Sequence, residues 1–254
     1  MSWQFLLTQL LNGVQFGLLL FLMAAGLTLV FGIMSFINLA HGSLYMVGAY
    51  LAALAYAHSG SFWLALLAAV VGLFALALLL DRLALSALHR RDHLDQVLAT
   101  FGIVLFANEA VRMLFGSAPL YMDTPAALSQ PVVIAGFNYP SYRGAIIAAG
   151  LAVAFGLHVL IDRTRVGMLI RAGASNRDMV SALGVNIGWL TSFIFALGAA
   201  LAGFAGAMVG PVLSIQPGMG EPVLILTLVV IVIGGIGSIR GALYGALIVG
   251  IVDT

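Results

Sequence analysis

The first 80 residues of the chain contain no aspartate, glutamate, lysine or arginine, and the first formal charge is Asp81. This stretch has room for roughly two to four membrane spans, because a spanning helix needs about 20 mainly apolar residues. Over the whole chain 63% of the residues are hydrophobic and 7% are charged, against about 45–50% and about 25% in soluble domains. A soluble fold cannot bury so much apolar surface, so the sequence predicts an integral membrane protein in a lipid bilayer.

The apolar runs are continuous, whereas the strands of a membrane β-barrel alternate apolar and polar residues. The predicted fold class is therefore all-α, a polytopic transmembrane helix bundle that forms a single domain over residues 1–254. Polar breaks divide the chain into about seven to eight spans, near residues 10–31, 43–56, 63–80, 96–114, 144–161, 187–209, 222–233 and 241–252. Polar residues and glycines between Phe31 and Tyr56 favour a broken or re-entrant helix there, covered by protein or lining a water-filled cavity.

Several function classes are not supported by the sequence. Residues 1–13 carry no basic side chain, so we expect no cleaved secretory signal peptide. Cysteine is absent, which excludes disulfides and cysteine-based metal or nucleophile sites. The net charge of +1 argues neither for nor against nucleic acid, and no nucleic-acid partner is predicted. The five histidines are scattered and no catalytic motif is present, so we predict no enzymatic residue, no metal and no cofactor.

The arginines predict the orientation in the membrane. Seven of the ten lie in two loops, 81–95 and 162–186. Two predicted spans separate these loops, so both lie on one side, which the positive-inside rule makes cytoplasmic. The proline-containing loop 116–143 is then outside, and so is the N-terminus if three spans precede Asp81. Four preceding spans would reverse the side of the N-terminus.

Three polar side chains, Asn38, His41 and Ser43, lie next to apolar runs of membrane length. Burying such a group without a partner costs roughly 2–7 kcal/mol, so each must face protein, water or a substrate. Two interpretations have equal support at this stage. The three residues either satisfy a helix break or line a substrate pathway.

Two acidic positions lie at the outer ends of predicted spans. Glu109 and Arg112 are three residues apart on one helix face, which favours an interfacial ion pair over a pathway role. Glu221 follows residues 217–220 at the mouth of the seventh span. A carboxylate at the edge of a span is a candidate functional residue, and solvated capping of that helix is an equally supported alternative.

The loop 162–186 contains the pattern of a short helix. Ser175 and Asp178 fit a capping box, with Ser175 as the N-cap and Asp178 at the third helical position. Gly184 is a typical helix stop. The apolar face of this helix consists of Met179, Val180 and Leu183. From the pattern alone, that face docks equally well on the protein's own membrane domain or on a cytosolic partner.

Glycines recur at helix-packing spacing near the end of the chain. Gly237, Gly241 and Gly245 are four residues apart, a spacing that lets helices approach closely in lipid. Together with Gly234 and Gly235 they form a glycine-rich packing motif. The run is not a phosphate-binding loop, because that pattern requires a lysine and the chain has none.

Three segments resemble one family of transporters. The segment Ala25–Tyr50 is similar to the opening signature of branched-chain amino acid ABC transporter permeases of the LivH type. The segment Gly167–Asn186, which includes Arg171-Ala and Ala182-Leu-Gly-Val-Asn186, resembles the cytoplasmic coupling loop of that family. The run from Val232 to Gly245 resembles its late glycine-rich signature. The three motifs occur in the family's order and extend over most of the chain.

The resemblance implies a permease subunit of an ABC importer in the bacterial inner membrane, carrying out amino-acid transport toward the cytoplasm. It implies a second related permease, two cytosolic ATPase subunits and a periplasmic substrate-binding protein as partners. The helix that begins near Ser175, preceded by Arg171, would then dock in a groove of the ATPase. Asn38, His41 and Gly42 would line or shape the substrate route.

One feature departs from the family pattern, and two other functions remain open. Family members continue past the glycine-rich signature with a further apolar segment, so we expect this chain, which ends at Thr254, to be short at its C-terminus. The main alternative function is a secondary transporter driven by an ion gradient, which the placement of the acidic residues at span ends disfavours. A non-transporting assembly subunit is the second alternative function. The sequence does not identify which amino acid, amide or urea is carried.

Overall fold

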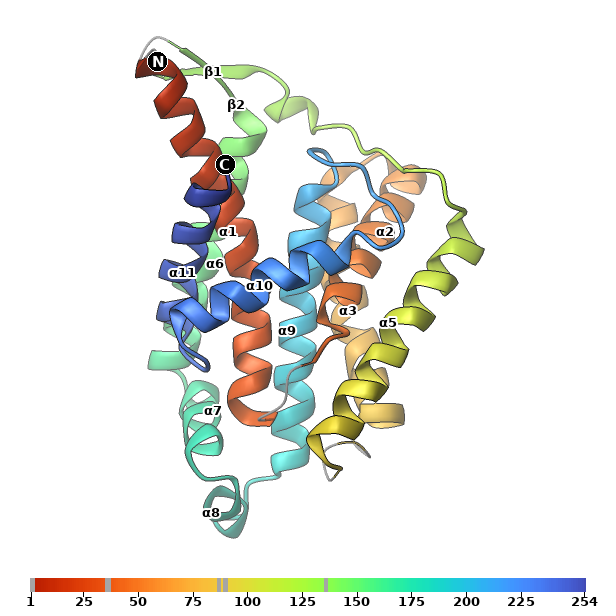
Figure 1. Ribbon diagram of the computed structural model, residues 1–254, viewed down its shortest axis with the longest axis vertical. Helices are drawn as coiled ribbons and strands as arrows, with labels where there is room; N and C mark the ends of the chain where they lie inside the picture. Colours follow the sequence, from red (N-terminus) through yellow and green to blue (C-terminus); the bar gives the residue numbers. More distant parts are fainter. Residues whose placement is uncertain (1–2, 35–37, 86–87, 89–90, 135–136) are drawn as a thin grey trace.

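A computed structural model describes residues 3–34, 38–85, 88, 91–134 and 137–254 (Figure 1). The long helices are α1 (Trp3–Met34), α2 (His41–Ser59), α3 (Phe62–Leu80), α5 (His93–Phe115), α6 (Ser141–Arg163) and α9 (Ile187–Val209). The shorter helices are η1 (Asp81–Leu85), η2 (Ala126–Leu128), α7 (Arg165–Ser175), α8 (Arg177–Ala182), α10 (Gly220–Gly234) and α11 (Ile239–Asp253). Strands β1 (Pro131–Ile134) and β2 (Phe137–Pro140) form an antiparallel hairpin in which Pro131 pairs with Pro140. The predicted all-α helix bundle is confirmed.

Helices α1 and α9 form the centre of the bundle. Within the most apolar stretch of 18 residues in each helix, 83% of the α1 residues and 78% of the α9 residues are buried. The corresponding share is only 17–22% for α3, α5 and α6. A helix that is apolar on all sides belongs in a core or in lipid. The outer helices therefore present their apolar side chains to the bilayer, as Phe106 and Leu114 of α5 do, with 75% and 77% of their surfaces exposed.

Among the described residues, five helices are long and apolar enough to cross a membrane, or six if α10 and α11 count as one bent pair. This number is lower than the predicted seven to eight. Helices α10 and α11 have 15 residues each, about 22 Å at the rise of an α-helix, which is shorter than the hydrocarbon core of about 30 Å. The chain bends by 120° between them. Helix α2, which contains three tyrosines and two histidines, is not among the five.

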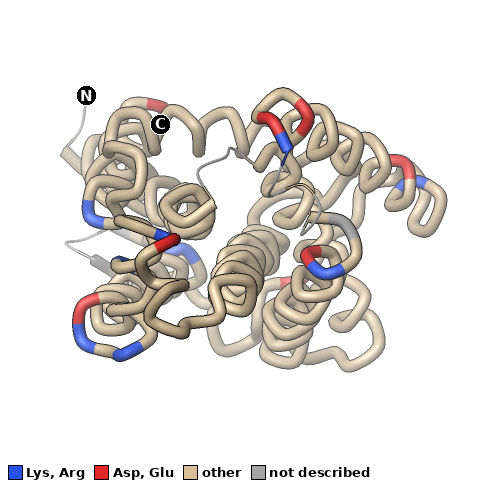
Figure 2. The backbone as a smooth tube through the Cα atoms, turned by 90° about the horizontal axis from the view of Figure 1, so that it is seen from below, with Lys and Arg blue, Asp and Glu red and all other residues tan. Residues whose placement is uncertain are grey.

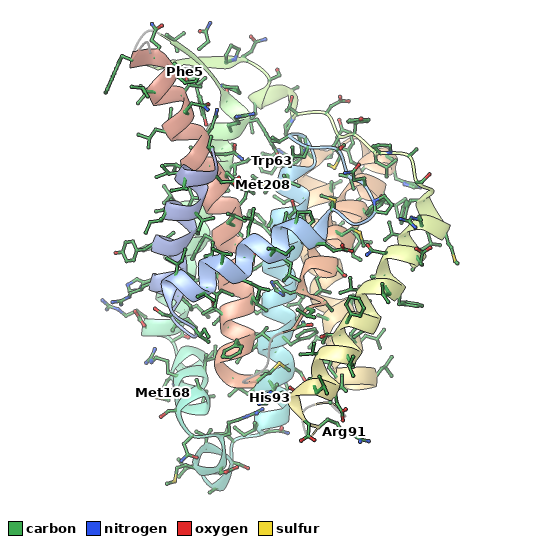
Figure 3. All side chains as sticks on the ribbon, in the orientation of Figure 1. Phe5, Trp63, Arg91, His93, Met168 and Met208 are labelled. Atoms are coloured by element: carbon green, nitrogen blue, oxygen red, sulfur yellow. The ribbon has the colours of Figure 1, made fainter. Side chains whose placement is uncertain are left out.

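The two arginine-rich loops lie at the same end of the molecule, as predicted. In Figure 3, Arg91 and His93 from one loop and Met168 from the other lie toward the lower end, whereas Phe5 and Trp63 lie toward the upper end. The hairpin β1–β2 is also at the upper end, beside the start of α1 (Figure 1). Seen from below, most of the charged positions lie toward the outside of the bundle (Figure 2). The start of α1 therefore lies at the end of the molecule opposite the two arginine-rich loops.

The predicted helix break between Phe31 and Tyr56 is present. Helix α1 ends at Met34 and a new helix begins at His41, while residues 35–37 lie outside the described part. Helix α2 begins inside the bundle, above the lower end of α1 (Figure 1). Helix α10 lies across the middle of the bundle, and its first residues approach the first residues of α2. Two interrupted helices therefore begin next to each other.

Candidate functional site

The start of α2 is held by Asn38 and His41, both fully buried. The Asn38 side-chain oxygen accepts a hydrogen bond of 3.0 Å from the Ala40 backbone N–H. The Nε2 atom of His41 lies 3.2 Å from the backbone oxygen of Met23 on α1. The His41 contact ties the first turn of α2 to α1, whereas the Asn38 contact is local to the residues that precede α2.

A cavity of about 300 Å³ lies next to this break, between α2, α5 and α10. Three of the five residues predicted for the substrate pathway, Gly42, Ser43 and Glu221, line it. Asn38 and His41 do not line it. The other lining residues are mostly apolar: Leu39, Met46, Phe101, Val104, Leu105, Asn108, Gly220, Leu224 and Ile225. Residues from three distant parts of the sequence therefore share one cavity.

The polar end of the cavity is formed by Glu221 and Asn108. The Asn108 side-chain N–H donates a hydrogen bond of 2.7 Å to Glu221 Oε1. The Asn108 side-chain oxygen accepts one of 3.1 Å from the Gly218 backbone N–H. Glu221 lies in the first turn of α10, where a negative charge is favoured by the helix dipole. The site thus presents a carboxylate and an amide beside an apolar wall.

Asn108 is absent from the sequence-based candidates. Its signal is present, because Asn108 is an amide side chain inside the predicted fourth span, and polar groups inside spans are functional candidates. In the same span, only the neighbouring pair Glu109 and Arg112 was considered from the sequence. Their side chains form an ion pair of 2.9 Å and both are more than half exposed, which confirms the predicted ion pair.

Gly42 and Gly220 allow α2 and α10 to meet. A Cβ atom on Gly42 would lie 2.6 Å from the Gly220 backbone oxygen, and a Cβ on Gly220 would collide with the Gly42 backbone oxygen. The two backbones are therefore in direct contact beside the cavity. A side chain on either glycine would force the helices apart and change the shape of the cavity.

The short helix predicted in the loop 162–186 differs from its prediction at the N-terminus. Ser175 is the last residue of α7 and does not cap the next helix. The N-cap of α8 is Asn176, whose side-chain oxygen accepts a hydrogen bond of 2.9 Å from the Met179 backbone N–H. The capping box from Ser175 to Asp178 was therefore wrong by one position. Gly184 has φ 86°, as expected of a residue that ends a helix.

The apolar residues of α8 divide between two environments. Val180 is buried, with 5% of its surface exposed. Met179 and Leu183 are 60% and 77% exposed. Val180 therefore anchors α8 to the protein's own membrane domain, and Met179 and Leu183 are free to contact another surface.

The glycine-rich segment 234–245 has two parts. Gly234, Gly241 and Gly245 pack α10 against α11: a Cβ on Gly245 would lie 2.7 Å from the Val230 backbone oxygen, and Cβ atoms on Gly234 and Gly241 would collide with each other's backbone. For Gly235 and Gly237 the predicted packing role was wrong. A Cβ on either would meet nothing within 4 Å, and their φ angles of 89° and 84° are the left-handed values that favour glycine. These two residues form the turn of the bent pair.

Comparison with known proteins places these features in a family context. The family model described as branched-chain amino acid transport system / permease component matches residues 9–254. The chain is 33% identical over 270 residues to the high-affinity branched-chain amino acid transport system permease protein LivH of Escherichia coli strain K12, an alignment that covers 100% of this chain and 87% of the relative. The corresponding permease protein BraD of Pseudomonas aeruginosa is 32% identical, over 97% of this chain and 85% of the relative.

A more distant similarity extends to an archaeon. The probable branched-chain amino acid transport permease protein LivH of Methanocaldococcus jannaschii is 28% identical, over 93% of this chain and 76% of the relative. No solved structure matches the chain. The matched region begins at residue 9 and reaches residue 254, so it includes the α2–α5–α10 cavity, helices α7 and α8 and the glycine-rich turn.

Proposed function

The chain belongs to the family of branched-chain amino acid transport permeases, and on this premise we propose that it is the membrane subunit of an ATP-driven importer in the bacterial inner membrane. It would move branched-chain or related amino acids toward the cytoplasm by alternating access. ATP hydrolysis would take place on cytosolic subunits. A second related permease and a periplasmic substrate-binding protein would complete the transporter.

The observation that carries the proposal is the cavity between α2, α5 and α10. Its volume of about 300 Å³ lies at the lower end of the range of small-molecule pockets. A branched-chain amino acid combines an apolar side chain with an ammonium and a carboxylate group. The apolar wall, which includes Phe101 and Leu224, suits the side chain, and the Glu221 carboxylate suits the ammonium group. The Asn108 amide has a second N–H besides the one bonded to Glu221, and this donor suits the substrate carboxylate.

The cytoplasmic end of the molecule supports a separate docking site for the ATPase. Helix α8 presents Met179 and Leu183 to the outside, although the chain has abundant apolar surface elsewhere that faces lipid. An apolar pair on a capped helix at the arginine-rich end has no lipid to contact. A groove on a cytosolic subunit would cover both side chains, and Asp178 in the first turn of α8 would be available for a basic partner residue.

The experiment that tests the proposal is uptake into sealed vesicles. The chain would be reconstituted with its partner subunits, and uptake of labelled leucine would be followed with ATP inside or outside and with the proton and sodium gradients collapsed. We expect uptake that needs ATP and survives loss of both gradients. Uptake that stops when a gradient collapses while ATP is held constant would favour the secondary-transporter alternative.

A further inference from the structure

Three basic side chains from three helices converge on one carboxylate, that of Asp162 near the end of α6. Arg240 of α11 reaches Asp162 Oδ2 at 2.7 Å. His158 Nδ1, one turn earlier on α6, lies 2.9 Å from the same oxygen. Arg171 of α7 lies 3.7 Å from Asp162 Oδ1 and also donates to the Ile161 backbone oxygen. The cluster therefore connects α6, α7 and α11.

Arg171 connects the cluster to helices α7 and α8. Helix α7 follows α6 after Thr164, whose side-chain oxygen accepts a hydrogen bond of 3.1 Å from the Gly167 backbone N–H. A Cβ on Gly167 would collide with the Leu160 and Ile161 backbone oxygens. The start of α7 is thus packed directly on the end of α6. Helix α8 follows at once, with Asn176 as the shared boundary residue, so a displacement of α8 pulls on α7 and on Arg171.

Arg240 connects the cluster to the bent pair α10–α11 and so to the cavity between α2, α5 and α10. Arg240 lies in the first turn of α11, directly after the turn formed by Gly235 and Gly237. The close glycine contacts between α10 and α11 make the bent pair move as one unit, because packed backbones do not slide past each other freely. The far end of α10 carries Glu221. A shift of Arg240 therefore reaches the polar end of the cavity through the length of α10.

An isolated exposed ion pair contributes little to stability, so stabilisation alone is a weak reason for this arrangement. Ionisable residues of membrane-spanning helices usually pair with one another and mark functional positions, and Asp162 of α6 is paired in this way. The Arg240 and Asp162 side chains are 74% and 33% exposed, and a cavity of about 420 Å³ beside them is lined by all four members of the cluster. The pair has room to shift.

We propose that the Asp162–Arg240 pair is a positioning element that links the cytoplasmic helices α7 and α8 to the bent pair α10–α11. Movement of the ATPase at α8 would reach Glu221 through Arg171, Asp162 and Arg240. This inference rests on the proposed function, because it assigns a route by which ATP hydrolysis elsewhere changes the substrate cavity. Asp162 and Arg240 would act through α10 and would not touch the substrate.

The test compares transport with ATP hydrolysis in the complete reconstituted transporter. We expect Asp162→Asn and Arg240→Gln to assemble normally and to hydrolyse ATP at the parent rate. Leucine uptake per ATP hydrolysed should fall roughly tenfold, within the usual range of coupling between sites. The double variant should be no worse than either single variant, because the two side chains act as a pair. The matched control is Glu109→Gln with Arg112→Gln, an exposed ion pair on α5 at the opposite end, which should leave the ratio unchanged.

A second measurement detects the movement itself. The chain has no native cysteine, so spin labels can be placed at Leu98→Cys on α5 and Val232→Cys on α10, both exposed positions. ATP should change the distance between the labels in the parent transporter and leave it unchanged in the Arg240→Gln variant. Variants that lose assembly, ATP hydrolysis and uptake together would show a merely structural role and overturn the inference.

The outcomes for the two proposals differ. Absence of ATP-driven uptake by the unaltered transporter would overturn the proposed function and this inference with it. Unchanged uptake per ATP in both variants of a working transporter, or additive losses in the double variant, would overturn the inference alone.

Discussion

The side-chain amide of Asn108 on α5 donates a hydrogen bond of 2.7 Å to the carboxylate of Glu221 on α10, across 113 residues of sequence. This bond connects the outer helix α5 with α10, which lies across the middle of the bundle (Figure 1). It also defines the polar end of the cavity that Gly42 and Ser43 line from α2. The substrate proposal depends on this group of residues.

Replacing Glu221 by glutamine tests the ammonium contact. The volume of the side chain is kept and its charge is removed, so we expect the KM for leucine uptake to rise about tenfold or more. Loss of a hydrogen bond to a charged group costs about 1.5–3 kcal/mol, and about 1.4 kcal/mol corresponds to a factor of ten. Glu109→Gln, an exposed carboxylate on α5, is the control and should leave KM unchanged. Equal effects of the two substitutions would argue against a substrate contact at Glu221.

Replacing Asn108 by leucine should also weaken uptake, by about tenfold in kcat/KM, because both Glu221 and the Gly218 N–H lose their partner. The measurement is leucine uptake at several substrate concentrations. Asn138→Leu, at an exposed position of β2, is the matched control. A normal kcat/KM in Asn108→Leu would remove Asn108 from the site.

Replacing Gly42 by alanine tests the contact between α2 and α10. The added Cβ would meet the Gly220 backbone oxygen at 2.6 Å, so we expect a loss of stability of about 1–3 kcal/mol, which is typical of overpacking. Thermal unfolding in mild detergent would detect it. Gly102→Ala on α5 is the control, because its Cβ meets nothing within 4 Å, and alanine is the better helix former. Equal unfolding temperatures for the two variants would contradict the close contact.

Replacing Asn176 by alanine tests the corrected cap of α8. The Met179 N–H loses its acceptor, and we expect α8 to lose about 1 kcal/mol of stability, as is usual for an N-cap. Hydrogen exchange of the amides of residues 177–182 would report this change. Ser175→Ala should have no such effect, since Ser175 lies inside α7. Faster exchange in the Ser175→Ala variant alone would restore the original capping box.

Local patterns in the sequence were sufficient to predict the long helices, the break before His41 and the common side of the two arginine-rich loops. Each depends on apolar length, polar interruptions or arginine position, which are visible in a single segment. The predicted N-cap of α8 was one residue too early because Ser175 and Asn176 are both good capping residues. Only the backbone conformation distinguishes them. The pattern therefore predicted the helix but not its first residue.

The cavity and the span count depend on tertiary structure. Asn108 becomes part of the site only because α10 brings Glu221 next to it. No pattern within α5 indicates this approach. Predicted spans seven and eight are both apolar, and the left-handed φ angles of Gly235 and Gly237 turn them into one bent pair. A glycine in a run of small residues fits packing and turning equally well, so the sequence did not separate the two roles.

The most direct test of the central claim is co-purification of the tagged chain in mild detergent, followed by mass spectrometry. The parent chain would be compared with a Met179→Asp, Leu183→Asp variant, which adds charge at the exposed face of α8 without altering the buried Val180. We predict that an ATPase subunit with a Walker motif is recovered with the parent and lost with the variant, while the variant keeps its folded state. Recovery of no ATPase with the parent, or equal recovery with the variant, would contradict the account.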